Sequence, residues 1–389
     1  MTRDIIIIDY EHAKGIKYMI IKEVITKKEA KLFTDFPNKL FKHIGAYVPA
    51  LSFDELNVFD KNKNPANMYC ESVRFLAIKD DKIVGRIAGI INHKYNESFD
   101  TKIVRFTRID MIDDIEVTTK LIDSVIGWGK SKGMTEIIGP IGFTDMDRMG
   151  MLVEGFEYLN MFITIWNPPY YKEHLETLGF VKDVDWIESV IPWPSVVPEK
   201  VTRGAHITRR RFGYELVKYK RKKDILQHIY EAFDVYNRAF HDLYGFFPVT
   251  KEVMDYYIKQ MISLVKLDFV WFVFDKHKKV IGFGLMMPSL ALANKKSNGR
   301  LLPFGLFRLL RALKRFKTID FYFIAVDPNH QGTGVLSMIM EDGIKQGIKY
   351  GVLQALTGPE LELNVKIQTQ WKDFNPSNYK RRRCYKKNI

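Results

Sequence analysis

The sequence predicts an α/β protein with a mixed sheet, organised as two similar α/β domains in tandem. Its 389 residues give room for two domains, and a composition of 46% hydrophobic and 27% charged residues is that of a globular protein. Prolines gather between residues 192 and 198, and the stretches on either side repeat one order of expected elements. The residues from Phe321 to Gly351 add a strand, a glycine loop and a helix in immediate succession. Strands that alternate with helices in this way are typical of a sheet covered by helices.

Each half contains a β-hairpin, an amphipathic helix and a short apolar strand, in that order. These are expected at 75–91, 115–132 and 136–138 in the first half, and at 269–287, 335–350 and 352–356 in the second. Apolar runs on either side of a short polar turn indicate the hairpins, and apolar residues every three or four positions indicate the helices. The repeat indicates a duplicated unit. We therefore place the domains at 1–195 and 213–389, joined by a linker at 196–212.

The loop before the second helix carries the most specific signal in the chain. An apolar strand ends at Asp327-Pro328, and residues 331–334, with the sequence QGTG, lead directly into the helix. Glycines let a backbone approach a ligand without a Cβ, and the free N–H groups of a helix start favour an anion. A Walker loop would need a Lys-Ser/Thr pair, and the dinucleotide fingerprint would need glycine where Ser337 stands. The segment predicts a site for phosphate or pyrophosphate.

The corresponding helix start in the first half is acidic. The sequence RIDMIDDIE, at 108–116, contains no glycine and places Asp110, Asp113, Asp114 and Glu116 around the expected start. Carboxylates stabilise a helix N-terminus but would repel a pyrophosphate. We therefore expect the second domain alone to bind such a ligand.

The loop resembles the pyrophosphate loop of the GNAT acyl-CoA N-acyltransferases, whose pattern is [Q/R]-x-x-G-x-[G/A]. Gln331 and Gly334 match that pattern, whereas Leu336 departs from its small residue. Nearly the whole chain resembles bacterial proteins with two GNAT domains in tandem. Further segments that carry the resemblance are NPANMYCESVRFLAIKDDKIVGRIAGIIN, GPIGF, MLVEGF, NPPYYKEHLETLGF and NGRLLPFGLF, which begin at residues 64, 139, 151, 167 and 298.

The resemblance implies roles for nine residues in binding acetyl-CoA or another acyl-CoA, the expected acyl donor. The loop residues would hold the pyrophosphate, backbone N–H groups of the preceding strand would bind the thioester oxygen, and an asparagine would contact the pantetheine arm. These residues are Gln331, Gly332, Thr333, Gly334 and Val335; Ile324, Ala325 and Val326; and Asn364. Many members place a tyrosine seven residues after that asparagine to protonate the thiolate. Here Trp371 stands there and has no proton of useful acidity, which leaves that role to water.

A base for the attacking amine is expected among carboxylates. Glu360 and Glu362 stand where the acceptor cleft should open, and either could accept the ammonium proton directly or through water. The alternative is a pair of exposed loop carboxylates. In the first half, Asp145 and Asp147 are candidates for recognising a cationic substrate, with loop capping as the alternative.

The net charge of +14 favours anionic partners, and much of it is clustered. One basic patch contains Arg203, Arg209, Arg210, Arg211, Lys218, Lys220, Arg221, Lys222 and Lys223, and a second is the segment from Tyr379 onward. Such runs are often solvated faces, but they allow weak contact with nucleic acid or an anionic membrane. Residues 301–317 form an apolar and basic helix pattern, which suits an ordinary crossover, a lid or a membrane-surface contact.

Other classes of protein find little support. Nine histidines without paired spacing predict no metal, and Cys70 and Cys384 give no disulfide framework. The opening residues, MTRDIIIIDYEHAKG, lack the features of a signal peptide, and no apolar run reaches the length of about 18 residues that spans a bilayer. We expect a cytoplasmic protein.

The resulting functional hypothesis is an acyl-CoA-dependent N-acyltransferase, acetyl by default, acting on a primary amine. One alternative is a tRNA-dependent aminoacyl transferase, which tandem domains and basic charge would suit but the coenzyme loop argues against. The other is a non-catalytic protein that binds nucleic acid or an anionic membrane. The acceptor, the acyl length and the oligomeric state stay open.

Overall fold

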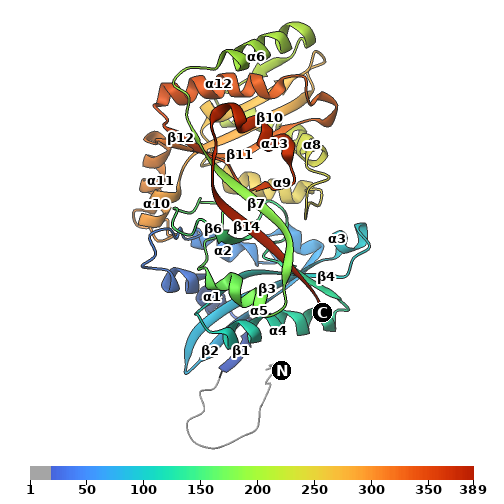
Figure 1. The fold of residues 1–389 in the computed structure, drawn as a ribbon, viewed down its shortest axis with the longest axis vertical. Helices are drawn as coiled ribbons and strands as arrows, with labels where there is room; N and C mark the ends of the chain where they lie inside the picture. Colours follow the sequence, from blue (N-terminus) through green and yellow to red (C-terminus); the bar gives the residue numbers. More distant parts are fainter. Residues whose placement is uncertain (1–18) are drawn as a thin grey trace, which may run out of the picture. The chain divides into compact units, whose positions relative to one another are not determined.

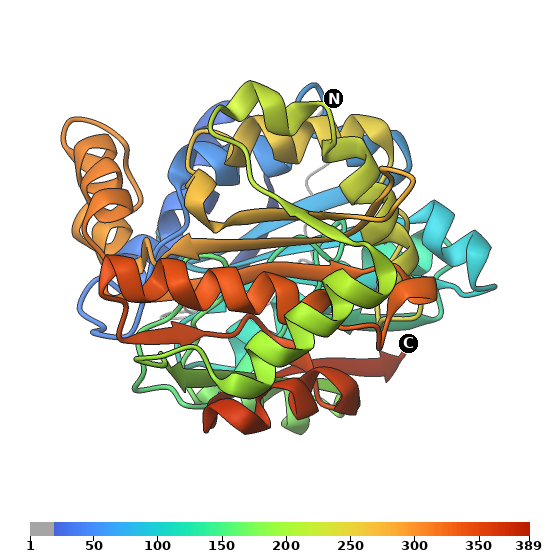
Figure 2. The same cartoon turned by 90° about the horizontal axis from the view of Figure 1, so that it is seen from above.

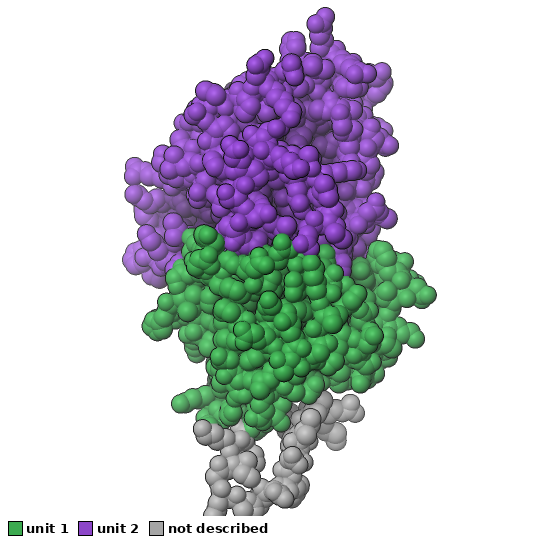
Figure 3. Space-filling view, in the orientation of Figure 1, with its two compact units in different colours: residues 1–185, 298–300, 381–389 green, residues 186–297, 301–380 purple. Residues whose placement is uncertain are grey.

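The computed structural model describes residues 19–389, and contacts within it divide the chain into two units (Figures 1 and 3). Among the described residues, unit 1 holds 19–185 together with Asn298–Arg300 and Arg381–Ile389. Unit 2 holds Trp186–Ser297 and Leu301–Lys380. The opening residues, in which we expect no signal peptide, lie outside the described part of the chain.

The sheet of unit 1 runs in the order β1-β2-β3-β4-β5-β14, and β4 and β5 are its parallel pair. Its strands are β1 (Met19–Glu23), β2 (Cys70–Lys79), β3 (Lys82–Asn92), β4 (Ile103–Met111), β5 (Glu136–Gly139), β6 (Met151–Glu154), the first part of β7 (Val181–Pro192) and the end of β14 (Ser377–Asn388). Its helices are α1 (Lys27–Leu40), α2 (Ser52–Val58), α3 (His93–Ser98), α4 (Ile115–Ser131) and α5 (Tyr170–Thr177). The hairpin expected at 75–91 is β2–β3, and its turn residues Asp80 and Asp81 have positive φ.

Helix α4 shows how the first acidic helix start is used. The Asp114 side chain accepts the N–H of Glu116 and caps the helix, as expected for a carboxylate at that position. The apolar face of α4 then packs on β3, where Gly85 and Gly89 leave room for Leu121 and for Val125 with its neighbouring ring. The acidic segment therefore starts a helix that covers the sheet.

The sheet of unit 2 runs in the order β7-β12-β11-β10-β9-β8, and β13 pairs with β7. Its strands are the end of β7, β8 (Glu215–Val217), β9 (Val270–Phe274), β10 (Val280–Pro288), β11 (Thr318–Val326), β12 (Gln354–Leu356) and β13 (Glu360–Leu361). Its helices are α6 (Glu199–Phe212), α7 (Lys222–Leu226), α8 (Ile229–Ala239), α9 (Lys251–Met261), α10 (Ala291–Lys296), α11 (Gly305–Lys314), α12 (Val335–Tyr350) and α13 (Val365–Trp371). β11 and β12 are its parallel pair, so both units have mixed sheets and the predicted α/β fold is confirmed.

The unit boundaries differ from the expected ranges 1–195, 196–212 and 213–389: residues 186–195 lie in unit 2 and 298–300 in unit 1, and two further differences involve longer segments. The end of β14 pairs with β5 from Tyr385 to Asn388, so residues 381–389 belong to unit 1. The expected linker contains helix α6, which packs directly on α12 in unit 2. Long-range strand pairing and helix contact, which leave no local signal, account for both differences.

Helix α12 lies between the sheet of unit 2 and α6. Gly282 and Gly284 of β10 leave room for Val335 and Ile339 on its apolar face. On its other side, the yellow-green α6 lies against the orange-red α12 in Figure 2. Because α12 begins directly after the glycine loop, these two contacts fix the position of that loop.

Candidate active site

Strands β11 and β12 separate where the candidate site begins. They pair over three residues, from Thr318 to Asp320 on β11, and beyond Asp320 the paired neighbour of β11 is β10 alone. The β10 register shifts opposite Tyr322, which leaves one extra residue on β11 and a local bend typical of a bulge. One edge of the last part of β11 therefore faces no strand among residues 19–389.

Two backbone N–H groups point to that open edge. The N–H of Asp327 donates to the carbonyl of Ile281 on β10, and N–H groups alternate in direction along a strand. Ala325, which stands opposite Phe283, therefore directs its N–H toward β10, whereas Ile324 and Val326 direct theirs away from it. Among the three residues expected to bind the thioester oxygen, these two have the suitable backbone direction.

The turn after β11 is held by Asp327. Its side chain accepts the N–H of Asn329 at 3.0 Å and the guanidinium of Arg238 at 2.8 Å. In the loop that follows, Tyr214 lies 2.6 Å from His330 through its hydroxyl. These contacts leave Gln331 and Gly332 exposed, directly before the start of α12.

Helix α12 starts without a side-chain cap. Gly334 occupies the N-cap position with φ 95° and provides no side chain to accept the first N–H groups. Those groups lack partners within a helix, and they attract a negatively charged ligand. The expected pyrophosphate position, from Gln331 to Val335, lies at this uncapped helix start, and its role in binding stays a prediction.

The two loop glycines have different surroundings. A Cβ on Gly332, whose φ is 75°, would meet nothing within 4 Å. A Cβ on Gly334 would lie 2.1 Å from Oγ1 of Thr208 on α6. That hydroxyl lies 2.8 Å from the carbonyls of Gly204 and Thr333, to either of which it can donate. Gly334 is therefore required for helix packing, whereas Gly332 leaves space for a ligand.

Glu360 is held by Trp371, the residue that replaces the tyrosine of the family pattern. The Trp371 indole N–H donates to Oε1 of Glu360 at 2.7 Å, and the buried ring packs on Phe321 of β11. Burial raises the pKa of Glu360 to about 7, although the indole hydrogen bond lowers it. Glu360 therefore changes charge near neutral pH, and Trp371 links it to Phe321 of β11.

The remaining predicted residues of this region have structural contacts. The side chain of Asn364 accepts the N–H of Ile367 at 3.4 Å and caps α13. Glu362 accepts a hydrogen bond from Gln368 through its backbone carbonyl. The roles expected for Asn364 in coenzyme binding and for Glu362 as a base stay predictions.

Asp320 is a further candidate that the sequence interpretation missed. It is fully buried at the last position where β11 pairs with β12, and its carboxylate oxygens make no hydrogen bond of ordinary geometry among the described residues, although the Ser289 hydroxyl lies close enough to stabilise the charged form. Burial raises its pKa to about 7, although the nearby Ser289 hydroxyl and Lys380 lower it. A single aspartate inside the apolar strand TIDFYFIAV is the signal that could have identified it.

The two candidates from the first half lie in unit 1. Asp147 accepts the N–H of Phe143 at 2.8 Å and lies 3.7 Å from the guanidinium of Arg108. Asp147 therefore caps a loop and forms an ion pair. Asp145 lies two residues earlier in the same loop. Within residues 19–389, no group of three histidine, cysteine or acidic side chains is arranged to hold a metal ion.

Two known proteins are similar to this chain in sequence. No family model matches the chain. It is 26% identical to protein YghO of Escherichia coli K12 over 388 residues, which is 95% of each protein. It is 24% identical over 298 residues to the bacterial ceramide synthase of Caulobacter vibrioides, covering 75% of each.

Solved structures resemble the chain over most of its length. A tandem GNAT protein from the clavulanic acid biosynthesis pathway superposes with a TM-score of 0.57 over 95% of this chain and 98% of its own, at 8% identity. A GCN5-related N-acetyltransferase from Sphaerobacter thermophilus gives a TM-score of 0.52, with 95% of both chains covered, at 10% identity. The chain therefore has the tandem GNAT fold.

Proposed function

We propose that the protein is an acyl-CoA-dependent N-acyltransferase whose acyl-CoA binds to unit 2. The observation that carries this proposal is the open edge of β11 leading into a helix start without a side-chain cap. An open strand edge can take the amide groups of a pantetheine arm, and the helix start can take the pyrophosphate. A single extended ligand of the shape of coenzyme A would use both.

The proposed reaction is direct transfer between sulfur and nitrogen. A neutral primary amine attacks the thioester carbon, the new C–N bond forms, and the C–S bond breaks to release the coenzyme thiolate. The N–H groups of Ile324 and Val326 would stabilise the negative charge on the thioester oxygen. Glu360 would accept the proton that the amine loses. Water would supply the proton to the thiolate, since the Trp371 N–H is engaged with Glu360.

One relative supports an amine as the acceptor. A ceramide is an amide of a long-chain amine, and the bacterial ceramide synthase is similar to three quarters of this chain. Long-chain amines are therefore the first acceptors to test beside small amines and peptide N-termini. A cytoplasmic location, and the use of acetyl-CoA rather than a longer acyl-CoA, belong to this proposal.

The experiment combines binding and turnover in the full chain. Calorimetry with CoA, acetyl-CoA and palmitoyl-CoA is expected to give one site per chain, and free thiol is expected to appear only when an amine is added. Two equivalent sites, or no binding at millimolar coenzyme, would contradict the proposal. Release of amino acid from aminoacyl-tRNA without any coenzyme would favour the tRNA-dependent alternative.

A pair of matched glycines provides the control. Gly332 in the loop and Gly133 in unit 1 both have positive φ, 75° and 78°, and both have open surroundings. Alanine at either position introduces the same backbone strain, but only Gly332→Ala adds bulk at the proposed pyrophosphate position. We expect Gly332→Ala to weaken CoA binding by about tenfold, or roughly 1.4 kcal/mol, and Gly133→Ala to leave it unchanged.

A second candidate property is contact with an anionic membrane through α11. Large apolar side chains on and before α11 are exposed, among them Leu302 at 78% and Phe307 at 66%, and exposed Arg311, Lys314 and Arg315 lie beside them. An apolar and basic helix of this kind suits the interface of an anionic bilayer. Across residues 19–389, no helix has the length and hydrophobicity to cross one.

Vesicle sedimentation tests this second property. Vesicles with phosphatidylglycerol are expected to bind the protein, and pure phosphatidylcholine vesicles are not. Phe307→Glu is expected to abolish binding, whereas Phe53→Glu, at a similarly exposed phenylalanine of unit 1 (61%), is the control. Equal binding of both variants would count against α11, and salt-sensitive binding of RNA alone would favour a nucleic-acid partner.

A further inference from the structure

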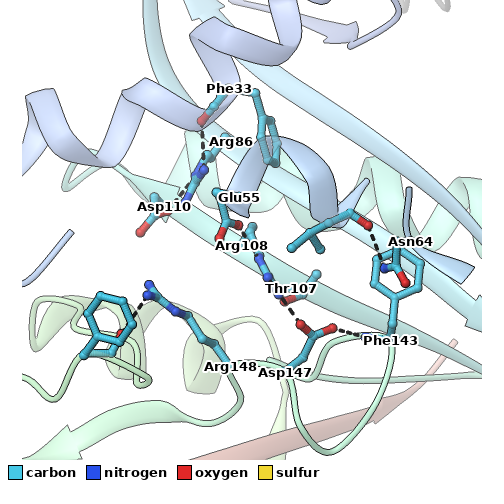
Figure 4. Close-up of polar contacts among 12 residues, drawn as sticks. Phe33, Glu55, Asn64, Arg86, Thr107, Arg108, Asp110, Phe143, Asp147 and Arg148 are labelled. Carbon is cyan, nitrogen blue, oxygen red and sulfur yellow. Dashed lines mark hydrogen bonds and ion pairs between the residues drawn. The ribbon is translucent and has the colours of Figure 1, made fainter. Parts of the chain in front are cut away.

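Unit 1 contains a polar cavity that the proposed acyl transfer does not use. Figure 4 shows polar contacts of its walls, among them those of Arg86, Arg108 and Arg148. Its walls come from sequence segments that carry the family resemblance but have no assigned role. Arg86 comes from the first hairpin, Pro140 from GPIGF, Met151 from MLVEGF, and Asn167 and Tyr171 from NPPYY. Segments far apart in the sequence thus meet around one cavity, which indicates a binding site.

Two of the three arginines that line the cavity are paired with carboxylates. Nε of Arg86 lies 2.7 Å from Asp110, and another of its nitrogens donates to the carbonyl of Phe33 at 2.8 Å. Nε of Arg108 lies 2.7 Å from Glu55. Arg108 also has a positive φ of 49°, a conformation that non-glycine residues adopt rarely and mainly at functional positions.

The third arginine, Arg148, has no such partner. It donates to the carbonyl of Phe162 at 2.8 Å, and no carboxylate of residues 19–389 lies within ion-pair distance of it. Burial lowers its pKa, which means that the charged form is poorly solvated there, and Asp54 and Glu55 act on it only from longer range. Arg148 is only half-buried by its solvent exposure, and a guanidinium in such a wall gains most from an anion that can accept two parallel hydrogen bonds.

Other polar groups face the same cavity. Asn38 accepts the hydroxyl proton of Tyr47 at 2.6 Å, and both residues line the wall together with Thr34. The cavity measures about 50 Å³, room for roughly four water molecules and therefore for a single carboxylate or phosphate group. A larger molecule would have to insert only its charged end.

We propose that this cavity binds the carboxylate or phosphate group of a small molecule, with Arg148 as its charged partner. Arg86 and Arg108 hold the walls through their own ion pairs, and Arg148 provides the charge that the ligand neutralises. This binding is independent of acyl transfer, because the cavity is formed entirely within unit 1 and the coenzyme site is proposed in unit 2.

The test uses the full chain with sodium acetate, succinate and inorganic phosphate, at matched ionic strength in chloride. Trp166 lines the cavity, so saturable binding is expected to change tryptophan fluorescence and raise Tm. Trp166→Phe is expected to remove the fluorescence change and keep the rise in Tm. Comparing the affinities for acetate and succinate with that for phosphate shows whether the cavity prefers a carboxylate or a phosphate group.

Arg148→Gln is the decisive variant, and Arg311→Gln, at an exposed arginine of α11, is its control. Removing one partner of a desolvated charge pair weakens binding by about 30-fold or more, so at a ligand concentration about ten times the wild-type Kd the response of Arg148→Gln should fall to about a quarter or less. An unchanged response in Arg148→Gln, or none in the wild type up to 100-millimolar ligand (about the weakest useful affinity), would overturn the proposal.

Crystals of the wild-type protein provide a test that does not depend on a variant folding. Soaking with arsenate, a phosphate analogue whose arsenic scatters anomalously, is expected to give anomalous density beside Arg148. Density only at exposed lysines or at lattice contacts would contradict the assignment. CoA titration of the same protein reports separately on unit 2, so failure of one proposal does not conceal failure of the other.

Discussion

The contact between Gly334 and Thr208 can be tested by a double-mutant cycle. In Gly334→Ala the new Cβ meets the Thr208 hydroxyl, and the backbone at φ 95° is unfavourable for alanine. The left-handed conformation costs about 1–2 kcal/mol. The clash is relieved most cheaply by rotating the Thr208 side chain, which gives up its hydrogen bond to Gly204 or Thr333 at about 1–2 kcal/mol.

The single variant should therefore lose about 2–4 kcal/mol of unfolding free energy. Thr208→Ala removes the hydroxyl in advance and leaves the Thr208 Cβ position 3.4 Å from the new methyl group, an ordinary contact. Adding Gly334→Ala to Thr208→Ala should then cost only the backbone term, so the two changes couple by about 1–2 kcal/mol.

Urea unfolding of the wild type, both single variants and the double variant measures this coupling. Additive losses, with a coupling energy within the usual error of about 0.5 kcal/mol, would refute the packing role of Gly334. Gly332→Ala in parallel should lose only the backbone term, because a Cβ there meets nothing. Equal losses at both glycines would likewise contradict the distinction between them.

Three further predictions concern the carboxylates of unit 2. Glu360→Gln should lower kcat by about 100-fold, as expected for the loss of a general base, and abolish the rise of kcat with pH near 7. Glu362→Gln should do neither. Equal effects of the two substitutions in a pH–rate series would reject Glu360 as the base. Trp371→Phe removes a hydrogen bond that lowers the pKa of Glu360, so the rise in kcat should move to higher pH, and an unmoved or acid-shifted profile would contradict it. The pKa of Asp320 is raised from its ordinary value of 3.8 to about 7, so the folded state favours the protonated acid. The free energy of unfolding therefore falls as the pH rises from about 4 to about 7. Asp320→Asn should therefore add about 1–4 kcal/mol above pH 7 and little below about pH 4, as measured by urea unfolding across pH; a pH-independent effect would exclude titration of Asp320 as its cause.

The local elements of the fold could be predicted from the sequence because their signals are local. The glycine loop and periodic apolar residues predicted a helix at 335–350, and α12 spans Val335–Tyr350. The pairing of β14 with β5 could not be predicted, because period-two patterning does not identify a strand's neighbour. Helix α6 was not predicted, and its contact with α12 includes the small residues Gly204 and Thr208, which carry no periodic apolar signal.

In the candidate site, too, the sequence predicts the positions of residues but not their tertiary contacts. The positions of the loop residues follow from sequence spacing, but the separate purposes of Gly332 and Gly334 depend on α6, more than 100 residues earlier in the chain. The raised pKa of Glu360 depends on burial, and its hydrogen bond comes from Trp371, eleven residues later. Tertiary contacts of this kind decide which of two neighbouring carboxylates titrates near neutral pH.

The end of β14 belongs to unit 1 although it is the last part of the chain, and this has a consequence for biosynthesis. Residues 385–388 pair with β5 in unit 1, yet the ribosome adds them only after the roughly 195 residues that follow Asp185 in unit 2. At about 5–20 residues per second, that interval lasts roughly 10–40 s. During it β5 is an unpaired sheet edge, a surface that invites pairing with another nascent chain. Co-translational chaperones would therefore have their greatest effect on unit 1, the half of the protein that emerges first and finishes folding last.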